Sequence, residues 1–342
     1  MSLIEAQQLT RSFRIPDKGP GFAAAVRHLV RPRFMERTAV DGIDLRVEAG
    51  ESVAYVGPNG AGKSTTLKML TGILAPTRGQ VRVRGLDPHR DRIANARHIG
   101  VVFGQRSQLW WDLPVFESLR LLGDIYDVPQ ADFTRNLGEL SELLELGELL
   151  RVPARQLSLG QRMRCEVAAA LLHGPDLVYL DEPTLGLDVA VKDNVRRFIR
   201  HINRERGVTV MLTSHDLGDI EDLCERMVMI DGGRIIFDGP LRTMRERFGK
   251  DCAIHLSLRG QMPDALEVAR KTLPELPAAC SSQPEPHELV VQFDMTQVPV
   301  GPLVGRLLAA LPVQDLRIQE SSIESILREL YKSRPKPQDP QP

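Results

Sequence analysis

The feature that most constrains this chain is the octapeptide at residues 57–64, Gly-Pro-Asn-Gly-Ala-Gly-Lys-Ser, which fits the pattern GxxxxGK[ST]. It follows the apolar run ESVAYV, and its last two residues begin KSTTLKMLTGIL, whose spacing predicts a helix. Backbone N–H groups in such a turn converge at the positive end of the helix dipole, where an anion is stabilised. We therefore expect a strand, a turn that holds phosphate, and a helix, in this order.

The candidate phosphate contacts come from this octapeptide and the residue after it. Lys63 is expected to reach the β- and γ-phosphates of a nucleotide, and the Ser64 hydroxyl to bind Mg²⁺. The alternative is a glycine-rich turn without a ligand, which the position between strand and helix disfavours. The predicted nucleotide-binding residues in this segment are Gly57, Pro58, Asn59, Gly60, Ala61, Gly62, Lys63, Ser64 and Thr65.

Two carboxylates end a second apolar strand pattern, LVYLDEP at residues 177–183. Asp181 suits Mg²⁺ binding, and Glu182 is placed to orient and deprotonate a water that attacks phosphorus. The alternative is an acidic turn that caps the strand before Pro183. His215 follows the next strand pattern, VTVMLTS, at the edge where open α/β sheets bind ligands. This position makes His215 a candidate γ-phosphate contact.

Short β-rich runs alternate with helical patterns from about residue 40 to 240, which predicts a mainly parallel sheet covered by helices. RMVMIDGGRIIFDG, near the end of this region, predicts an antiparallel hairpin around its Asp-Gly-Gly turn. Strand and helix patterns alternate again over 250–332 without a phosphate loop, so a small second α/β domain is expected there. The tail at 333–342 has too little apolar content to order itself.

Composition limits the partners of this chain. Its 342 residues include 44 Lys and Arg against 45 Asp and Glu, so a net charge of −1 gives no global attraction to nucleic acid or an anionic bilayer. No stretch reaches the roughly 18 continuous apolar residues of a membrane span, and the N-terminus does not resemble a signal peptide. The 4 cysteines form no CxxC pair and suit reduced thiols. We expect a chain that is not secreted and does not cross a membrane alone.

The motifs occur in one order: the phosphate loop, Gln105 after IGVVF, LSLGQ at 157–161, LVYLDEP, LGLD at 185–188, and His215. In this order and spacing the chain resembles the ATP-binding cassette (ABC) ATPases. Within them it is most similar to the nucleotide-binding subunits of bacterial ABC-2-type exporters, in the branch with daunorubicin-resistance, sodium-export and viologen-export subunits. The resemblance implies an α/β, P-loop NTPase cassette over residues 1–245, with a mainly parallel sheet core, an antiparallel β subdomain and a helical subdomain at about 106–172. The C-terminal α/β domain would then be an accessory domain.

The resemblance also implies roles for single residues. Phe13 would stack on adenine, and Gln105 would contact Mg²⁺ and the attacking water. Ser158, Gly160 and Gln161 would bind the γ-phosphate of ATP held by the other subunit, while Asp188 would link the two sites of the dimer. The expected catalytic set is Lys63, Gln105, Glu182 and His215, and the expected metal set is Ser64, Gln105 and Asp181.

Such an enzyme would bind two ATP, with Mg²⁺, between two cassettes arranged head to tail. Because the chain carries one cassette, it would pair with a second copy of itself or a similar cassette. It would power separate ABC-2-type permease subunits, for export, from the cytoplasmic face of the membrane. One rival is a soluble ABC ATPase that acts on nucleic acid or the ribosome, but no second cassette, long coiled coil or zinc module is visible. A hydrolysis-poor regulatory subunit is the other rival, which the presence of Asp181, Glu182 and His215 opposes; no nucleic-acid partner is expected.

Two features depart from the common pattern of the family. A basic insertion lies at about 14–38, and residues 11–38 carry seven Lys or Arg against two acids. Its apolar spacing suits a short amphipathic helix near the adenine edge or the membrane, and a solvated loop is the alternative. Leu159 replaces the first glycine of the usual LSGGQ. Because Ser158 and Gln161 fit a capping box and Leu159 keeps its N–H, we still expect an active site.

Two further segments carry weaker predictions. Trp110 and Trp111 follow Gln105 in a stretch that, in the family, borders the groove for the permease's coupling helix. At least one is therefore expected at that groove, with ordinary core packing as the alternative. In the C-terminal domain, the apolar stripe from Ile323 to Leu330 is expected to pack the domain, and a dimer-stabilising or regulatory role rests on the resemblance alone.

Overall fold

The computed structural model of this chain describes residues 2–16, 34–104, 107–214, 216–248, 251–274, 276, 281–294 and 297–320. The chain divides into two units, Met1–Gly239 and Pro240–Pro342. Several sequence predictions lie outside the described residues: most of the basic insertion (17–33), Gln105, His215, the apolar stripe from Ile323 to Leu330, and the tail at 333–342.

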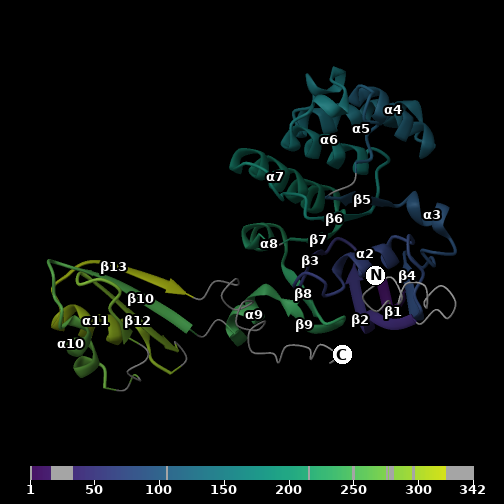
Figure 1. The fold of residues 1–342 in the computed structure, drawn as a ribbon. Helices are drawn as coiled ribbons and strands as arrows, with labels where there is room; N and C mark the ends of the chain where they lie inside the picture. The colour runs from purple at the N-terminus through teal and green to yellow at the C-terminus, as the bar shows by residue number, and fades with distance from the viewer. Residues whose placement is uncertain are drawn as a thin grey trace, which may run out of the picture. The chain divides into compact units, whose positions relative to one another are not determined.

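A six-stranded sheet forms the centre of the first unit, with the strand order β5-β6-β7-β3-β8-β9 (Figure 1). The pairing is parallel between β5 and β6, β6 and β7, β7 and β3, and β3 and β8. Because β3, β6 and β7 are almost wholly buried, their sequences are continuous apolar runs. The strands are β3 (Ser52–Val56), β5 (Ile99–Phe103), β6 (Leu177–Asp181), β7 (Thr209–Thr213), β8 (Arg226–Asp231) and β9 (Arg234–Pro240).

The hairpin predicted near the end of this region is confirmed. β8 and β9 are neighbours in the sheet, and only Gly232 and Gly233 separate them. These glycines have φ values of 54° and 81°. A two-residue turn with both residues at positive φ matches the twist of the strands that it joins, and glycine adopts it without strain.

A three-stranded sheet, β2-β1-β4, covers the helix that follows the phosphate loop. Both of its pairings are antiparallel. Side chains from this sheet, from β3 and from that helix form one apolar core, which includes Ile4, Val40, Tyr55 and Leu67. The shared core fixes the phosphate loop between the two sheets. The elements are β1 (Ser2–Pro16), β2 (Phe34–Glu48), β4 (Arg78–Val83) and helix α2 (Lys63–Leu70).

Helices α4, α5 and α6 gather at one end of the first unit, away from β1, β2 and β4 (Figure 1). They lie in the sequence between β5 and β6, and α6 packs on β5. Helices α7 and α8 pack against each other and follow β6 and β7. The helices of this unit after α2 are α3 (Arg92–Ala96), α4 (Val115–Ile125), α5 (Gln130–Leu143), α6 (Leu159–Leu171), α7 (Val189–Arg206) and α8 (Leu217–Leu223), with 3-10 turns η1 (Leu149–Arg151) and η2 (Ala154–Gln156).

The second unit has its own sheet and its own core. Its sheet has the order β11-β12-β10-β13 and is antiparallel throughout. Apolar side chains of β10, β12, α10 and α11 pack together, among them Leu256, Phe293 and Leu307. The elements are α9 (Leu241–Phe248), β10 (Asp251–Leu258), α10 (Ala265–Thr272), β11 (Ser281–Ser282), β12 (Glu288–Asp294), α11 (Val300–Ala310) and β13 (Val313–Glu320).

Candidate nucleotide-binding site

The glycine-rich loop between β3 and α2 leaves no room for side chains at two of its positions. A Cβ on Gly57 would lie 2.2 Å from the carbonyl oxygen of Ile230, and one on Gly62 would lie 2.5 Å from that of Ala39. Gly62 also has a φ of 115°, which other residues rarely adopt. Gly62 begins α2 without a side-chain cap, so the first N–H groups of the helix are left for a ligand.

Lys63 is held inside the curve of this loop. Its side chain is 8% exposed. Its Nζ donates to the carbonyl oxygen of Gly57 at 2.5 Å and to that of Pro58 at 3.3 Å. Burial lowers the pKa of Lys63, while Glu182 and Asp181 act in the opposite direction. An anion beside this ammonium group would likewise favour its charged form.

One cavity of about 700 Å³ joins the loop to the ends of two parallel strands. Phe103 and Gly104 lie at the end of β5, and Asp181 and Glu182 lie at the end of β6. The sequence-predicted residues that line this cavity are Pro58, Asn59, Gly60, Gly62, Lys63, Ser64, Thr65, Asp181 and Glu182. The phosphate loop and the carboxylates of Asp181 and Glu182, which are far apart in sequence, therefore line the same cavity.

The end of β6 is held by Thr213, at the end of the neighbouring β7. Thr213 Oγ1 donates to Asp181 Oδ1 at 2.6 Å. The backbone N–H of Glu182 donates to the carbonyl oxygen of Thr213 at 3.1 Å, and it lies 3.2 Å from Thr213 Oγ1. Glu182 has a φ of 56°, an unusual conformation for a residue with a side chain. Thr213 was not among the residues predicted from the sequence, although the parallel register of the two strands places it opposite Asp181.

Magnesium fits the donor set at this site. The Ser64 hydroxyl and the Asp181 carboxylate both line the cavity. Mg²⁺ prefers oxygen ligands and takes one or two from protein, the rest coming from phosphate and water. The two side chains can therefore hold Mg²⁺ together with a nucleotide's phosphates.

The remaining predicted ATP contacts that the structure describes do not line this cavity. Phe13 is half-buried on β1, with the Arg11 guanidinium 4.8 Å from its ring centroid. Asp188 is exposed, and its carboxylate caps α7 by accepting from the N–H of Val191 at 2.9 Å. Ser158, Gly160 and Gln161 lie at the start of α6. Gln105 and His215 lie outside the described residues.

The capping box predicted at the start of α6 is present. Ser158 Oγ accepts from the N–H of Gln161 at 3.2 Å, and the Gln161 side chain accepts from the N–H of Ser158 at 2.9 Å. Leu159 is 42% exposed. A Cβ on Gly186 would lie 3.1 Å from Leu159 Cδ2, so the leucine lies beside the LGLD turn. Leu159, which stands in place of the usual glycine, therefore lies on the surface and leaves the cap of α6 intact.

A buried carboxylate that the sequence analysis missed lies on α6. Glu166 accepts from the Ser107 hydroxyl, and it accepts from the N–H of Gln108 at 2.9 Å. Burial raises the pKa of Glu166, while these hydrogen bonds act in the opposite direction. Glu166 thereby fastens α6 to the chain just after Gln105.

Both tryptophans lie on the surface next to this contact. Trp110 is 39% exposed and Trp111 is 52% exposed. The Arg162 guanidinium of α6 lies 5.8 Å from the Trp111 ring centroid. Core packing, the alternative weighed for the pair, is wrong for both residues.

The comparisons with known proteins agree on one family. Residues 40–185 match the family described as ABC transporter. The linearmycin resistance ATP-binding protein LnrL of Bacillus subtilis (strain 168) is 30% identical over 306 residues, which are 88% of this chain and 96% of that protein. This chain is an ABC transporter ATP-binding protein. This family membership also confirms the predicted fold class, an α/β cassette.

Other relatives of this ABC protein carry similar names. The ABC transporter ATP-binding protein NatA of Bacillus subtilis (strain 168) is 32% identical over 61% of this chain and 84% of its own length. The Nod factor export ATP-binding protein I of Paraburkholderia xenovorans (strain LB400) is 38% identical over 65% and 73%. A solved ATP-binding subunit of an ABC transporter superposes with a TM-score of 0.60 at 27% identity, over 72% of this chain and 93% of that one.

The activity of the ABC protein follows from its membership of this family. It binds and hydrolyses ATP as a subunit of a transporter. ATP-binding subunits of this family dimerise and work with membrane permeases. Among the described residues, no helix combines the length and the apolar character needed to cross a bilayer.

Proposed function

We propose that this ABC protein hydrolyses ATP with Mg²⁺ as a dimer of two copies, and that it drives export through ABC-2-type permease subunits at the cytoplasmic face of the membrane. The observation that carries the proposal is the single cavity shared by the phosphate loop and the carboxylates at the end of β6. We also propose the division expected from the sequence, a cassette over 1–245 and an accessory domain over 250–332.

Each side chain at the cavity has a distinct part in hydrolysis. Lys63 and the loop N–H groups bind the β- and γ-phosphates. Ser64, Gln105 and Asp181 would hold Mg²⁺, which would neutralise charge on the phosphates. Glu182 accepts the proton of the water that attacks the γ-phosphorus, because it follows Asp181 directly and lines the same cavity. We assign contact with that water to Gln105 and contact with the γ-phosphate to His215.

The positions of the signature residues support a dimer with shared sites. Ser158, Gly160, Gln161 and Asp188 are all absent from the lining of the cavity that holds Lys63. The capped start of α6 nevertheless has the N–H groups of an anion site. We assign the first three to the γ-phosphate of ATP on the second copy, and Asp188 to communication between the two sites. Phe13 is assigned to adenine stacking.

The proposed permease contact lies at the helical end of the cassette. Trp110 and Trp111 are exposed there, and Phe116 and Ile125 of α4 are exposed as well. Exposed aromatic side chains are enriched at protein interfaces. The direction of transport is inferred from relatives named for linearmycin resistance and Nod factor export.

The test of this proposal compares wild type with Glu182→Gln, and uses Glu225→Gln at an exposed site as the matched control. A general base contributes about 10²–10⁴-fold to rate. We therefore expect Glu182→Gln to lower ATP hydrolysis at least 100-fold and to accumulate as an ATP-bound dimer. Wild-type hydrolysis no faster than that of Glu182→Gln would overturn the enzymatic assignment. A chain that never joins membranes in cells that contain an ABC-2-type permease would overturn the transport assignment.

A further inference from the structure

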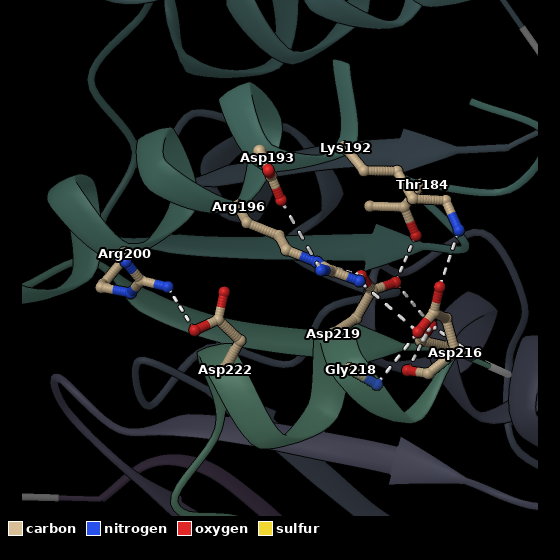
Figure 2. Close-up of polar contacts among 10 residues, drawn as sticks. Thr184, Lys192, Asp193, Arg196, Arg200, Asp216, Gly218, Asp219 and Asp222 are labelled. Atoms are coloured by element: carbon tan, nitrogen blue, oxygen red, sulfur yellow. Dashed lines mark hydrogen bonds and ion pairs between the residues drawn. The ribbon is translucent and has the colours of Figure 1, made fainter. Parts of the chain in front are cut away.

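A fully buried carboxylate lies on α8. Asp219 is 0% exposed. Its Oδ1 accepts from Arg196 Nε at 2.6 Å, and its Oδ2 accepts from Ser214 Oγ at 2.9 Å and from the Thr184 hydroxyl (Figure 2). Both oxygens are thus occupied by donors from three other segments.

Those three segments each carry a residue of the proposed ATP site. Thr184 is two residues after Glu182, and Ser214 directly precedes His215. Arg196 lies on α7, the helix that Asp188 caps. Asp219 is therefore hydrogen-bonded to three segments. These are the turn that contains Glu182 and Thr184 (the Glu182 turn), the residue that follows β7, and helix α7.

A second acid strengthens the same junction. Asp216 Oδ2 accepts from Lys192 Nζ at 2.7 Å, and its Oδ1 lies 3.4 Å from a terminal nitrogen of Arg196 (Figure 2). The hydrogen bond from Lys192 lowers the pKa of Asp216 against the effect of burial. Ser214 Oγ also accepts from the N–H of Asp216 at 3.0 Å. Two acidic side chains, Asp216 and Asp219, thus pair with the basic side chains of Lys192 and Arg196 and join α7 to the start of α8.

The geometry separates this junction from the loop that binds phosphate. Thr184, Ser214 and Asp219 have no side-chain hydrogen bond with residues 57–64, and none of them lines the cavity. Loss of Asp219 would therefore act on the Glu182 turn rather than on Lys63. A catalytic base displaced by about 1 Å can cost about 10²-fold in rate.

We propose that Asp219 is a positioning residue for ATP hydrolysis, which holds the Glu182 turn, the segment that leads to His215 and helix α7 as one rigid unit. This inference rests on the proposed function. It predicts a loss in kcat with little change in the binding of ATP. A residue that serves only the stability of the fold would lower the amount of folded protein and leave the kcat of the folded fraction unchanged.

The matched control is the neighbouring ion pair on the same two helices. Asp222 of α8 pairs with Arg200 of α7 (Figure 2). Asp222 is 40% exposed, and its ion pair with Arg200 involves neither Thr184 nor Ser214. An exposed pair of this kind contributes only about 0–1 kcal/mol. Asp222→Asn therefore keeps the contact between the helices almost unchanged and leaves the Asp219 junction intact.

The deciding experiment measures kcat, KM for ATP, equilibrium binding of a fluorescent ATP analogue and Tm for Asp219→Asn, Asp219→Ala and Asp222→Asn. Asparagine has the shape of aspartate and can still bond with Thr184 and Ser214, but it loses the ionic contact with Arg196. We expect kcat to fall about 10-fold or more in Asp219→Ala and less in Asp219→Asn, with analogue binding within about twofold of wild type. Asp222→Asn is expected to match wild type.

The results that overturn the inference are distinct from those that overturn the proposed function. Wild-type kcat in folded Asp219→Asn and Asp219→Ala would remove the positioning role, as would equal losses of kcat and analogue binding. Failure of the isosteric Asp219→Asn to fold would also overturn it, because the role would then be structural. In each case wild type still hydrolyses ATP and Glu182→Gln still does not, so the proposed function stands.

Discussion

The two units of this ABC protein fill their interiors differently. In the first unit, buried polar and charged side chains include Lys63, Glu166, Thr213 and Asp219. In the described part of the second unit, Ser281 is the one buried polar side chain, and the core is formed by residues such as Leu256 and Phe293. A buried polar group costs free energy unless it has hydrogen-bond partners. The contrast teaches that the first unit bears this cost at several positions, Lys63 and Thr213 at the candidate site among them, whereas the described core of the second unit is almost wholly apolar.

The largest effect is expected at Lys63. Lys63→Met removes an ammonium that can make two charge-assisted hydrogen bonds with phosphate, each of about 1.5–3 kcal/mol. Since about 1.4 kcal/mol is tenfold in affinity, the dissociation constant for ATP should rise at least about 100-fold. Isothermal titration calorimetry measures this change. The control is Lys271→Met, at an exposed position in the second unit. Equal affinity for ATP in both variants would contradict the role of Lys63 in phosphate binding.

The next prediction tests whether the core of the second unit serves only its stability and not ATP hydrolysis. Leu256→Ala removes a buried side chain of β10, the strand between β12 and β13, which should cost about 2–5 kcal/mol in the stability of that unit. Hydrolysis per cassette should stay the same. Leu212→Ala in β7 is the matched variant, and it should lower both stability and hydrolysis because β7 carries Thr213. Urea unfolding and ATPase rates separate the two, and a loss of ATPase activity in Leu256→Ala would indicate regulation by the second unit.

A smaller effect is expected at Leu159. Leu159→Gly keeps the Ser158 and Gln161 cap and every backbone N–H, and a glycine in a helix costs roughly 1 kcal/mol. We expect hydrolysis within about fivefold of wild type, because about 1 kcal/mol corresponds to a factor of roughly 5. Steady-state ATPase assays measure it. Loss of most activity would show that the leucine side chain itself takes part in the site.

The smallest effect concerns the pH dependence of stability at Glu166. Its pKa in the folded protein is raised above the ordinary 4.5, so its favourable contribution is present below pH 4.5 and is lost as pH rises through the folded-state pKa. Glutamine cannot ionise, so the Tm of Glu166→Gln relative to wild type should increase as pH rises above 4.5. Thermal melts between pH 4.5 and 8 measure it.

The control for this variant is Glu142→Gln, at an exposed position on α5. A Tm difference between Glu166→Gln and wild type that stays constant with pH would mean that burial of the Glu166 carboxylate does not penalise its charged form.

Much of the fold could be predicted because its signals are local. The order of strands and helices, the glycine pair between β8 and β9, and the box of Ser158 and Gln161 all depend on residues within a few positions of each other. The exposure of both Trp110 and Trp111 could not be predicted from the pair itself, since an aromatic pair suits a core and a surface equally well in sequence.

The sequence by itself determined the phosphate loop and the carboxylates after β6. Backbone sterics admit only glycine at Gly62, and a strand that ends in Asp181 and Glu182 presents both at one sheet edge. Only the tertiary structure decided which side chains support them. Thr184 and Asp219 are 35 positions apart, and Ser107 and Glu166 are 59 apart. Such contacts depend on how strands and helices pack, and periodicity or spacing along the chain carries no record of that.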